Sequence, residues 1–362
     1  MIARIAVVYA VMMFSFVGIV QSIDAQETTA TAYPDHQHVM QWIDFKGDLQ
    51  AVTSAAHWQT RRAHILAGMQ QVMGPLPSSA SRGELDMQVI EMEELPTLTR
   101  SKITYLAGPG DRIPAYLLIP KNKAPKSCPA MLCLHGTSGP RGRTAGLGAD
   151  YARYALELAE RGYVTIAPDY TLLGDNQTDP ESLGYASGTM KGIWSHMRAV
   201  DLLESIPEVD ASRMGTIGVS LGGHNSLFVS VFDERLKVMV TSSGFDSFLD
   251  YMNGNPTGWC QKRYMPRIET IYGKDPKKIP FDFPEVLAAI APRAVYIHAP
   301  LSDSNFKVES AKQCTAEARK VFQLLSADSK LQIVTPPGEH GFPIEERQKA
   351  YEFVDRILKP QM

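Results

Sequence analysis

One stretch constrains this chain more than any other: a short apolar run, Met214 to Val219, which breaks at Ser220 and resumes as an apolar, small-residue helix. Gly218 and Gly222 flank Ser220 in the pattern Gly-x-Ser-x-Gly. A strand, a turn too sharp for bulky neighbours and a helix make up a nucleophile elbow, whose strained backbone exposes the serine Oγ. The same pattern occurs by chance in glycine-rich turns, but the flanking strand and helix favour a nucleophile at the carboxyl edge of a parallel sheet.

The rest of the chain supports this fold class. Beyond Pro120, apolar runs of strand length alternate with amphipathic stretches of helix length, which indicates a parallel sheet with helices on both faces. Before Pro120, alternating runs at 86–92, 102–106 and 115–119 predict an antiparallel N-terminal part. We therefore predict an α/β fold with a mostly parallel, doubly covered sheet. The later predicted strands are 130–134, 163–167, 214–219, 236–241, 294–299 and 331–335, and the predicted helices are 150–161, 190–203, 221–232, 307–325 and 344–358.

The chain divides into segments of different character. Residues 1–25 resemble a signal peptide, because Arg4 precedes an apolar run that ends near a cleavage point at Ala25. An uncleaved anchor is the alternative, since the run approaches the ~17 residues that span a bilayer. Residues 26–85 are expected to be an N-terminal extension, mobile to about Gln50 and then forming a docking helix that begins at Ser54. Residues 86–362 form the predicted α/β domain, with a lid-like, aromatic-rich insertion at 245–290.

Composition excludes several classes of function. The 362 residues are 44% hydrophobic and carry a net charge of −3, which gives no reason to expect nucleic acid or an anionic membrane as a partner. After signal cleavage we expect an exported protein, periplasmic or extracellular, without stable membrane association. No residues show metal-ligand spacing, so we predict no metal and no cofactor.

The four cysteines are too scattered for a disulfide-built domain. Cys128 and Cys133 bound one predicted strand and lie about 16 Å apart, whereas a disulfide needs Cα atoms within about 7 Å. Buried thiols, or one long-range bridge involving Cys260 or Cys314, remain the two interpretations.

Polar residues follow several predicted strands at the edge where ligands bind in open α/β sheets. A serine hydroxyl such as that of Ser220 needs a base to accept its proton, and His340, in a glycine-containing loop after the last strand, is the candidate. Asp303, after the preceding strand, would orient the imidazole and stabilise the imidazolium that forms. Asp246, after the strand at 236–241, is the alternative acid.

A reaction at Ser220 also needs N–H donors for the negative charge that develops on the substrate oxygen. We expect these to be the backbone N–H groups of Leu221, at the start of the elbow helix, and Thr137, after the strand at 130–134. The loop at 138–143 and the insertion should close over the elbow and leave space for a small acyl group. Asp169 is expected to line the pocket or brace its loop. The other predicted pocket residues are Tyr170, Trp259 and Arg263.

With these residues in place, the chain from about Lys102 onward resembles the α/β-hydrolase superfamily, in which the order Ser220, Asp303, His340 is the usual one. Within it, the chain is similar to secreted bacterial dienelactone-hydrolase-like and acetylxylan-esterase-like proteins. The stretches that carry this resemblance, besides the elbow, are 115–120, 134–136, 291–293 and 339–343. The resemblance implies a serine esterase. Serine at 220, where dienelactone hydrolases have cysteine, and Val219, where histidine is frequent, argue against a true dienelactone hydrolase.

Three functions remain open at this point. The first is hydrolysis of carboxylic esters, of short acyl type, on carbohydrate or small molecules. The second is a serine peptidase of the prolyl-oligopeptidase kind, although the chain has no room for the large β-propeller of those enzymes. The third is a binding protein without catalysis. Aromatic residues of the insertion, with Lys262 and Arg263, are suited to binding a sugar, or else form a small core of their own. The sequence leaves the oligomeric state open.

Overall fold

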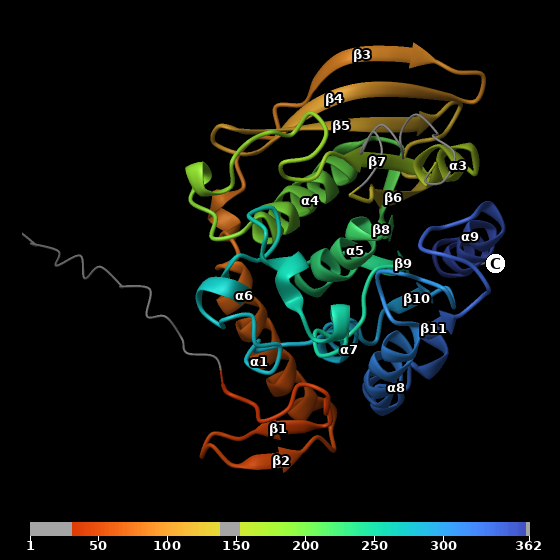
Figure 1. Ribbon diagram of the computed structural model, residues 1–362. Coiled ribbons are helices and arrows are strands. Elements are labelled where there is room, and N and C mark those ends of the chain that lie inside the picture. The colour runs from red at the N-terminus through yellow and green to blue at the C-terminus, as the bar shows by residue number, and fades with distance from the viewer. Residues whose placement is uncertain (1–30, 138–152, 360–362) are drawn as a thin grey trace, which may run out of the picture.

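A computed structural model describes residues 31–137 and 153–359 of the chain. Its centre is a nine-stranded sheet in the order β11-β10-β9-β8-β6-β7-β5-β4-β3. Strands β6 to β11 pair in parallel, whereas β3, β4 and β5 are antiparallel to one another and β5 is antiparallel to β7. Figure 1 shows β3, β4 and β5 at one end of the molecule and a separate β1–β2 hairpin at the other. The predicted fold class, with its antiparallel N-terminal part, is confirmed.

The elements lie close to the predicted ranges, and the main differences are in length. Strand β4 is longer than its apolar run because it pairs with β5 along almost its whole length. The strands are β1 Gln41–Ile43, β2 Leu49–Ala51, β3 Gln88–Glu94, β4 Leu98–Gly108, β5 Asp111–Pro120, β6 Cys128–Leu134, β7 Val164–Pro168, β8 Val209–Val219, β9 Leu236–Ser242, β10 Ala294–His298 and β11 Leu331–Val334. The α-helices are α1 Ala55–Met73, α3 Tyr154–Glu160, α4 Gly188–Ser205, α5 Leu221–Phe232, α6 Arg267–Thr270, α7 Phe283–Ile290, α8 Val308–Leu324 and α9 Ile344–Leu358.

Helices cover both faces of the parallel part of the sheet. Buried residues of α4, α5 and α8 belong to one apolar cluster, and those of α3 and α9 belong to a second cluster on the opposite face. Successive strand residues alternate between the two: in β10, Val295 and Ile297 join the first, and Ala294 and Tyr296 join the second. Because both faces are buried, these strands are apolar almost throughout, which is why they were visible in the sequence.

The N-terminal segment differs from its prediction. The sequence predicted a mobile start up to about Gln50, but from residue 31 onward the described chain packs on the body of the protein. The hydroxyl of Tyr33 lies 2.8 Å from Nδ1 of His64 in α1, and Val39 is fully buried. The partners of this segment are distant in sequence and its residues are mostly polar, so no local periodicity indicated that it packs on the rest of the protein. Residues 26–30 lie outside the described residues.

The insertion at 245–290 contains η3 (Tyr251–Asn253), η4 (Pro256–Cys260), α6 and α7. Most of its aromatic side chains are buried: Phe248, Phe281 and Phe283 have no exposed surface, whereas Tyr251, Tyr264 and Tyr272 are half-buried. Phe283 stacks on Phe228 of α5 with ring centroids 5.8 Å apart, so this core is continuous with the main one. Whether the segment acts as a lid remains a prediction.

All four cysteines are free thiols, and those of Cys128, Cys133 and Cys314 are buried. No helix within the described ranges is long and apolar enough to cross a membrane. In the same ranges, no group of three or more His, Cys, Asp or Glu side chains is arranged to hold a metal ion. The predicted signal peptide at 1–25 lies outside the described residues.

Candidate active site

Ser220 occupies the turn between β8 and α5 with φ 56° and ψ −119°. This is a rarely occupied backbone conformation for a residue with a side chain, and strain of this kind persists only where the surroundings hold it. The surroundings require the two flanking glycines. A Cβ atom on Gly222 would overlap the carbonyl oxygen of Leu134, and one on Gly218 would overlap the backbone of Gly222. The chain therefore has the strand–turn–helix geometry that the sequence pattern predicts.

The carboxyl ends of the parallel strands form one aligned edge. Ser220 follows β8, His135 follows β6, Asp303 follows β10 and His340 follows β11. Since neighbouring strand ends are paired, the residues that follow them leave the sheet at the same edge. The paired residues at this edge are Leu134 with Gly218, Val219 with Ser242, Ser242 with His298, and His298 with Val334.

Asp303 and His340 form a hydrogen-bonded pair at this edge. Nδ1 of His340 lies 2.9 Å and 3.0 Å from the two carboxylate oxygens of Asp303. Burial by itself raises the pKa of Asp303, but the bonds from His340 and from the backbone N–H groups of Asn305 and Phe306 outweigh it and hold the pKa below its usual value. The carboxylate is thus kept ionised beside an imidazole whose side chain is 29% exposed.

Asp246, the alternative acid, has a different hydrogen-bond partner. It is buried, and one carboxylate oxygen accepts the backbone N–H of Lys307 at 3.0 Å. The other oxygen has no hydrogen-bond partner among the described residues. Burial raises the pKa of Asp246 to about 7. Of the two predicted acids, Asp303 is the one that contacts His340.

The elbow and the loop that carries His340 meet at the end of β9. The backbone N–H of Ser220 donates to the carbonyl of Ser242 at 2.9 Å. The hydroxyl of the same Ser242 donates to the carbonyl of Gly341, also at 2.9 Å. One residue therefore contacts the backbone of both predicted reacting segments.

The predicted oxyanion donors belong to two segments, the loop after β6 and the start of α5. A Cβ atom built on Gly136 would lie 3.7 Å from the Cβ of Ser220, so the loop after β6 passes directly beside the serine. Thr137 follows in that loop, and its Oγ1 lies 3.1 Å from the hydroxyl of Tyr264. Leu221 opens α5, where the partial positive charge of the helix N-terminus favours an anion. It packs in one cluster with Tyr264. Tyr264 was not predicted as a site residue, since its partners are far away in sequence.

Asp169 and Tyr170 fix the loop after β7. The carboxylate of Asp169 accepts the backbone N–H of Asp175 at 2.8 Å, as expected of a residue that braces its loop. The N–H of Tyr170 donates to Nε2 of His135 at 2.9 Å, and its hydroxyl donates to the carbonyl of Arg263 at 2.7 Å. The His135 ring therefore holds the backbone of the loop after β7, and Tyr170 ties the insertion to that loop.

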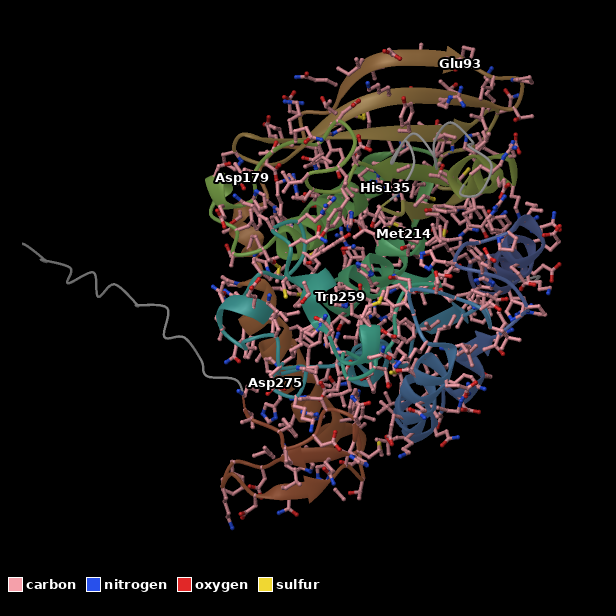
Figure 2. The ribbon with its side chains drawn as sticks, in the orientation of Figure 1. Glu93, His135, Asp179, Met214, Trp259 and Asp275 are labelled. Carbon is pink, nitrogen blue, oxygen red and sulfur yellow. The ribbon has the colours of Figure 1, made fainter. Side chains whose placement is uncertain are left out.

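Trp259 is buried in the interior of the molecule beside α5 (Figure 2), only 4% exposed. Its ring lies 4.7 Å from that of His224 and 6.4 Å from that of Phe306, which in turn lies 6.0 Å from His340. The guanidinium of Arg263 lies 5.8 Å from the ring of Tyr264. Tyr170 and Trp259 thus belong with Tyr264 to one set of neighbouring rings, here called the aromatic wall, that runs from the loop after β6 towards His340. The predicted contribution of 138–143 lies outside the described residues.

Comparisons with known proteins agree with this architecture. The family described as "Glucuronyl esterase, fungi" matches residues 170–326. YtaP of Bacillus subtilis (strain 168), a protein named as a hydrolase, is 30% identical over 192 residues, which cover 49% of this chain and 63% of YtaP. The matched region thus spans less than two thirds of that relative.

Two solved structures illustrate the likeness of fold. A glucuronoyl esterase from Solibacter usitatus has a TM-score of 0.67 at 20% identity, covering 90% of this chain and 98% of that one. An acetyl xylan esterase from Paenibacillus sp. R4 has a TM-score of 0.56 at 19% identity, covering 84% and 96%.

A likeness over 90% of the chain, with a doubly covered parallel sheet and a serine at the strand-to-helix turn of its carboxyl edge, shows that this protein has the fold of the α/β-hydrolases. Within that class it is similar to glucuronoyl and acetyl xylan esterases. The predicted resemblance to α/β-hydrolase serine esterases is thereby confirmed.

Proposed function

We propose that the protein is a serine carboxylic-ester hydrolase whose catalytic triad is Ser220, His340 and Asp303. The observation that carries this proposal is the strained backbone of Ser220 at the sheet edge that also holds the hydrogen-bonded Asp303–His340 pair. Unstrained serines with a neighbouring histidine are common in proteins. A strained serine on a strand-to-helix turn is expected where the conformation serves chemistry.

The triad would act in two half-reactions. In the first, His340 accepts the proton of Ser220 as Oγ attacks the ester carbonyl, and Asp303 stabilises the imidazolium. The N–H groups of Leu221 and Thr137 stabilise the oxyanion, and His340 passes its proton to the departing alcohol. In the second, His340 takes a proton from water, which attacks the acyl-enzyme, and then returns that proton to Ser220. The products are the free acid and the alcohol.

For the substrate, we propose an ester carried by a carbohydrate. The similarity to glucuronoyl and acetyl xylan esterases supports this class. Tyr170, Trp259 and Arg263 would line the sugar site, next to the loop that Asp169 braces. The similar proteins named above with a stated substrate are esterases, which favours ester over peptide hydrolysis.

Within this class, two substrates differ in which side of the ester bears the sugar. The sequence predicts a short acyl group, as in acetylated sugars, where the sugar is the alcohol. The match to the glucuronyl esterase family favours a uronoyl ester, where the sugar is the acyl group. We retain the short acyl ester as the first candidate and the uronoyl ester as the second.

We also propose that the protein is exported, with a signal peptide cleaved after Ala25. The charged, apolar and small-residue pattern of residues 1–25 supports this. Sequencing the N-terminus of the protein secreted or released from the periplasm would test it, and a chain that retains Met1 in the membrane fraction would contradict it.

The decisive experiment for the activity uses the chain from Gln26. We expect it to hydrolyse p-nitrophenyl acetate and to be labelled by a fluorophosphonate at Ser220, with labelling lost in Ser220→Ala. A folded protein labelled at another serine, or at none, would contradict the assignment. Acetylated xylose, methyl glucuronate and an aminoacyl amide, tested in parallel, distinguish the acetyl, uronoyl and peptidase alternatives. Activity should persist in EDTA, whereas loss that added metal reverses would contradict the predicted absence of a cofactor.

A further inference from the structure

The loop that carries His340 has to reach across the sheet. It leaves β11, and Ser220 leaves β8, three strands away in the sheet order. At about 4.8 Å per strand, the two strand ends are about 14 Å apart. A base that serves Ser220 must therefore be carried over the ends of β10 and β9, and its loop needs anchors along that path.

The first anchors belong to the loop after β10. The backbone N–H of Leu301 donates to the carbonyl of Pro336, and that of Ser302 donates to the carbonyl of Gly338, both at 2.9 Å. These bonds hold the part of the loop before His340. They place it beside Asp303 but do not bring it to the elbow.

The remaining anchor lies on the elbow side of His340. The hydroxyl of Ser242 donates to the carbonyl of Gly341, and the carbonyl of Ser242 accepts the N–H of Ser220. Ser243 adds longer contacts, since its Oγ lies 3.3 Å from both the nitrogen and the oxygen of Gly341. Gly341 directly follows His340, so this anchor fixes the base against the end of the strand next to the nucleophile.

His298, the last residue of β10, determines how the Ser242 hydroxyl points. Nδ1 of His298 lies 2.8 Å from Oγ of Ser242. That hydroxyl has one proton, which it donates to Gly341, so the proton shared with His298 must come from Nδ1–H. The Nε2 atom then carries a lone pair, and it has no hydrogen-bond partner among the described residues. Burial lowers the pKa of His298 to about 4, which agrees with a neutral ring.

We propose that Ser242 and His298 are a positioning pair that holds the loop of His340 against the nucleophile elbow. The pair touches no substrate and acts through the backbone of Gly341 and Ser220. The inference rests on the proposed roles of Ser220 and His340. The pair differs from an ordinary buried hydrogen bond in one respect, because its loss should affect turnover far more than stability.

The test compares variants that separate these effects. Ser242→Ala removes the hydroxyl. His298→Phe keeps a ring against Phe342, whose centroid lies 5.1 Å away, but removes the N–H donor. His298→Asn keeps a donor near the position of Nδ1 and loses most of the ring. Ser230→Ala is the matched control, since Ser230 is equally buried, in α5, and its hydroxyl also bonds to a backbone carbonyl.

We expect Ser242→Ala and His298→Phe to lower kcat for p-nitrophenyl acetate about 10- to 100-fold, since misplacement by an ångström has effects of this size. KM should change little, and Tm should fall no further than in Ser230→Ala. His298→Asn should recover most of kcat although its Tm is the lower of the two His298 variants. A less stable variant that is the more active one would not be produced by a purely structural role.

Amide hydrogen exchange gives a readout that does not depend on activity. Residues 339–342 should exchange faster in Ser242→Ala and His298→Phe than in the wild type or in Ser230→Ala. If the wild type hydrolyses esters and the variants match Ser230→Ala in kcat, the pair has no positioning role and the proposed function stands. If the wild type is a folded protein without ester hydrolysis, the proposed function fails, and unchanged exchange at 339–342 would overturn the pair as well.

Discussion

Two polar regions of the molecule differ in how far they expose their charged groups. The first is the sheet edge that carries the candidate triad, and the second is the buried salt bridge of Arg61 with Glu285, here called the N-terminal anchor. At the edge, Ser220 has a strained backbone and the His340 side chain is 29% exposed. At the anchor, Arg61 and Glu285 form a salt bridge in which both side chains are 1% exposed. One region keeps polar groups accessible, and the other encloses them.

At the anchor, the buried charges have further partners within the protein. Besides its salt bridge with Arg61, the Glu285 carboxylate lies 3.0 Å from Nδ1 of His36 and accepts a hydrogen bond from the backbone N–H of Asp282 at 3.1 Å. The Asp282 carboxylate accepts Gln37 at 2.7 Å. Breaking a buried pair of this kind leaves an uncompensated charge and destabilises the fold, whereas a site must leave groups available for substrate. The comparison therefore predicts that changes at the edge affect rate and that changes at the anchor affect stability.

The largest expected effect tests the edge. Asp303→Ala should lower kcat by about 10⁴-fold, because the imidazole loses the carboxylate that fixes its tautomer and stabilises its charge. Urea unfolding should change little. Asp246→Ala is the control and should keep most of the activity. If Asp246→Ala loses activity and Asp303→Ala keeps it, the acid follows β9 and the assignment is wrong.

The second prediction tests the anchor. Arg61→Met leaves the Glu285 carboxylate buried with only His36 as a side-chain partner, which should lower the free energy of unfolding by about 3–5 kcal/mol. The turnover of the folded fraction should stay at the wild-type value. The double variant Arg61→Met/Glu285→Gln has no unpaired charge and should recover part of the loss. A drop in kcat at unchanged stability would show that the two regions are not separate in function.

The same contrast explains what the sequence could predict. The elbow is local: Gly218 and Gly222 are needed within two residues of Ser220, so a short pattern contains all its requirements. Asp303 and His340 were found because parallel strand ends share an edge. The anchor was missed, and a mobile segment expected in its place, because Arg61 and Glu285 are separated by 224 residues.

Three further residues near the site were missed for the same reason, namely Tyr264, Ser242 and His298. Each lies in a segment that the sequence placed correctly, but its partner belongs to another segment. Periodicity gives the face of an element on which a residue lies, and it does not give the side chain that the residue meets. The serines 242 and 243 directly after a strand at the site edge were the one signal that was available.

The third prediction concerns pH and the buried Asp246. Its pKa in the folded protein is about 7, against an ordinary value of 3.8. Between about pH 4 and pH 7 the folded state holds a proton that the unfolded state has lost, so the free energy of unfolding decreases as pH rises. Asp246→Asn cannot ionise and should lack this decrease. Relative to the wild type, it should gain on the order of 2–4 kcal/mol across that interval.

Urea unfolding at several pH values measures this difference, and contributions from other groups cancel between the two proteins. A constant difference from pH 4 to pH 7 would mean that Asp246 ionises in the folded state as it does in the unfolded chain. Activity at pH 7 should be retained by Asp246→Asn, in contrast to Asp303→Ala, since only Asp303 contacts His340.

The smallest effect tests where the edge ends and the enclosed core begins. Tyr264 belongs to the aromatic wall, yet its hydroxyl reaches Oγ1 of Thr137 in the proposed oxyanion loop. Tyr264→Phe should lower kcat about fivefold, the effect of one hydrogen bond of about 1 kcal/mol, with Tm almost unchanged. Tyr251→Phe, in the same insertion and half-buried, is the matched control and should leave kcat unaltered. If Tyr264→Phe instead lowers Tm and leaves kcat at the control value, Tyr264 belongs with the enclosed core, and the insertion contributes shape rather than alignment to the site.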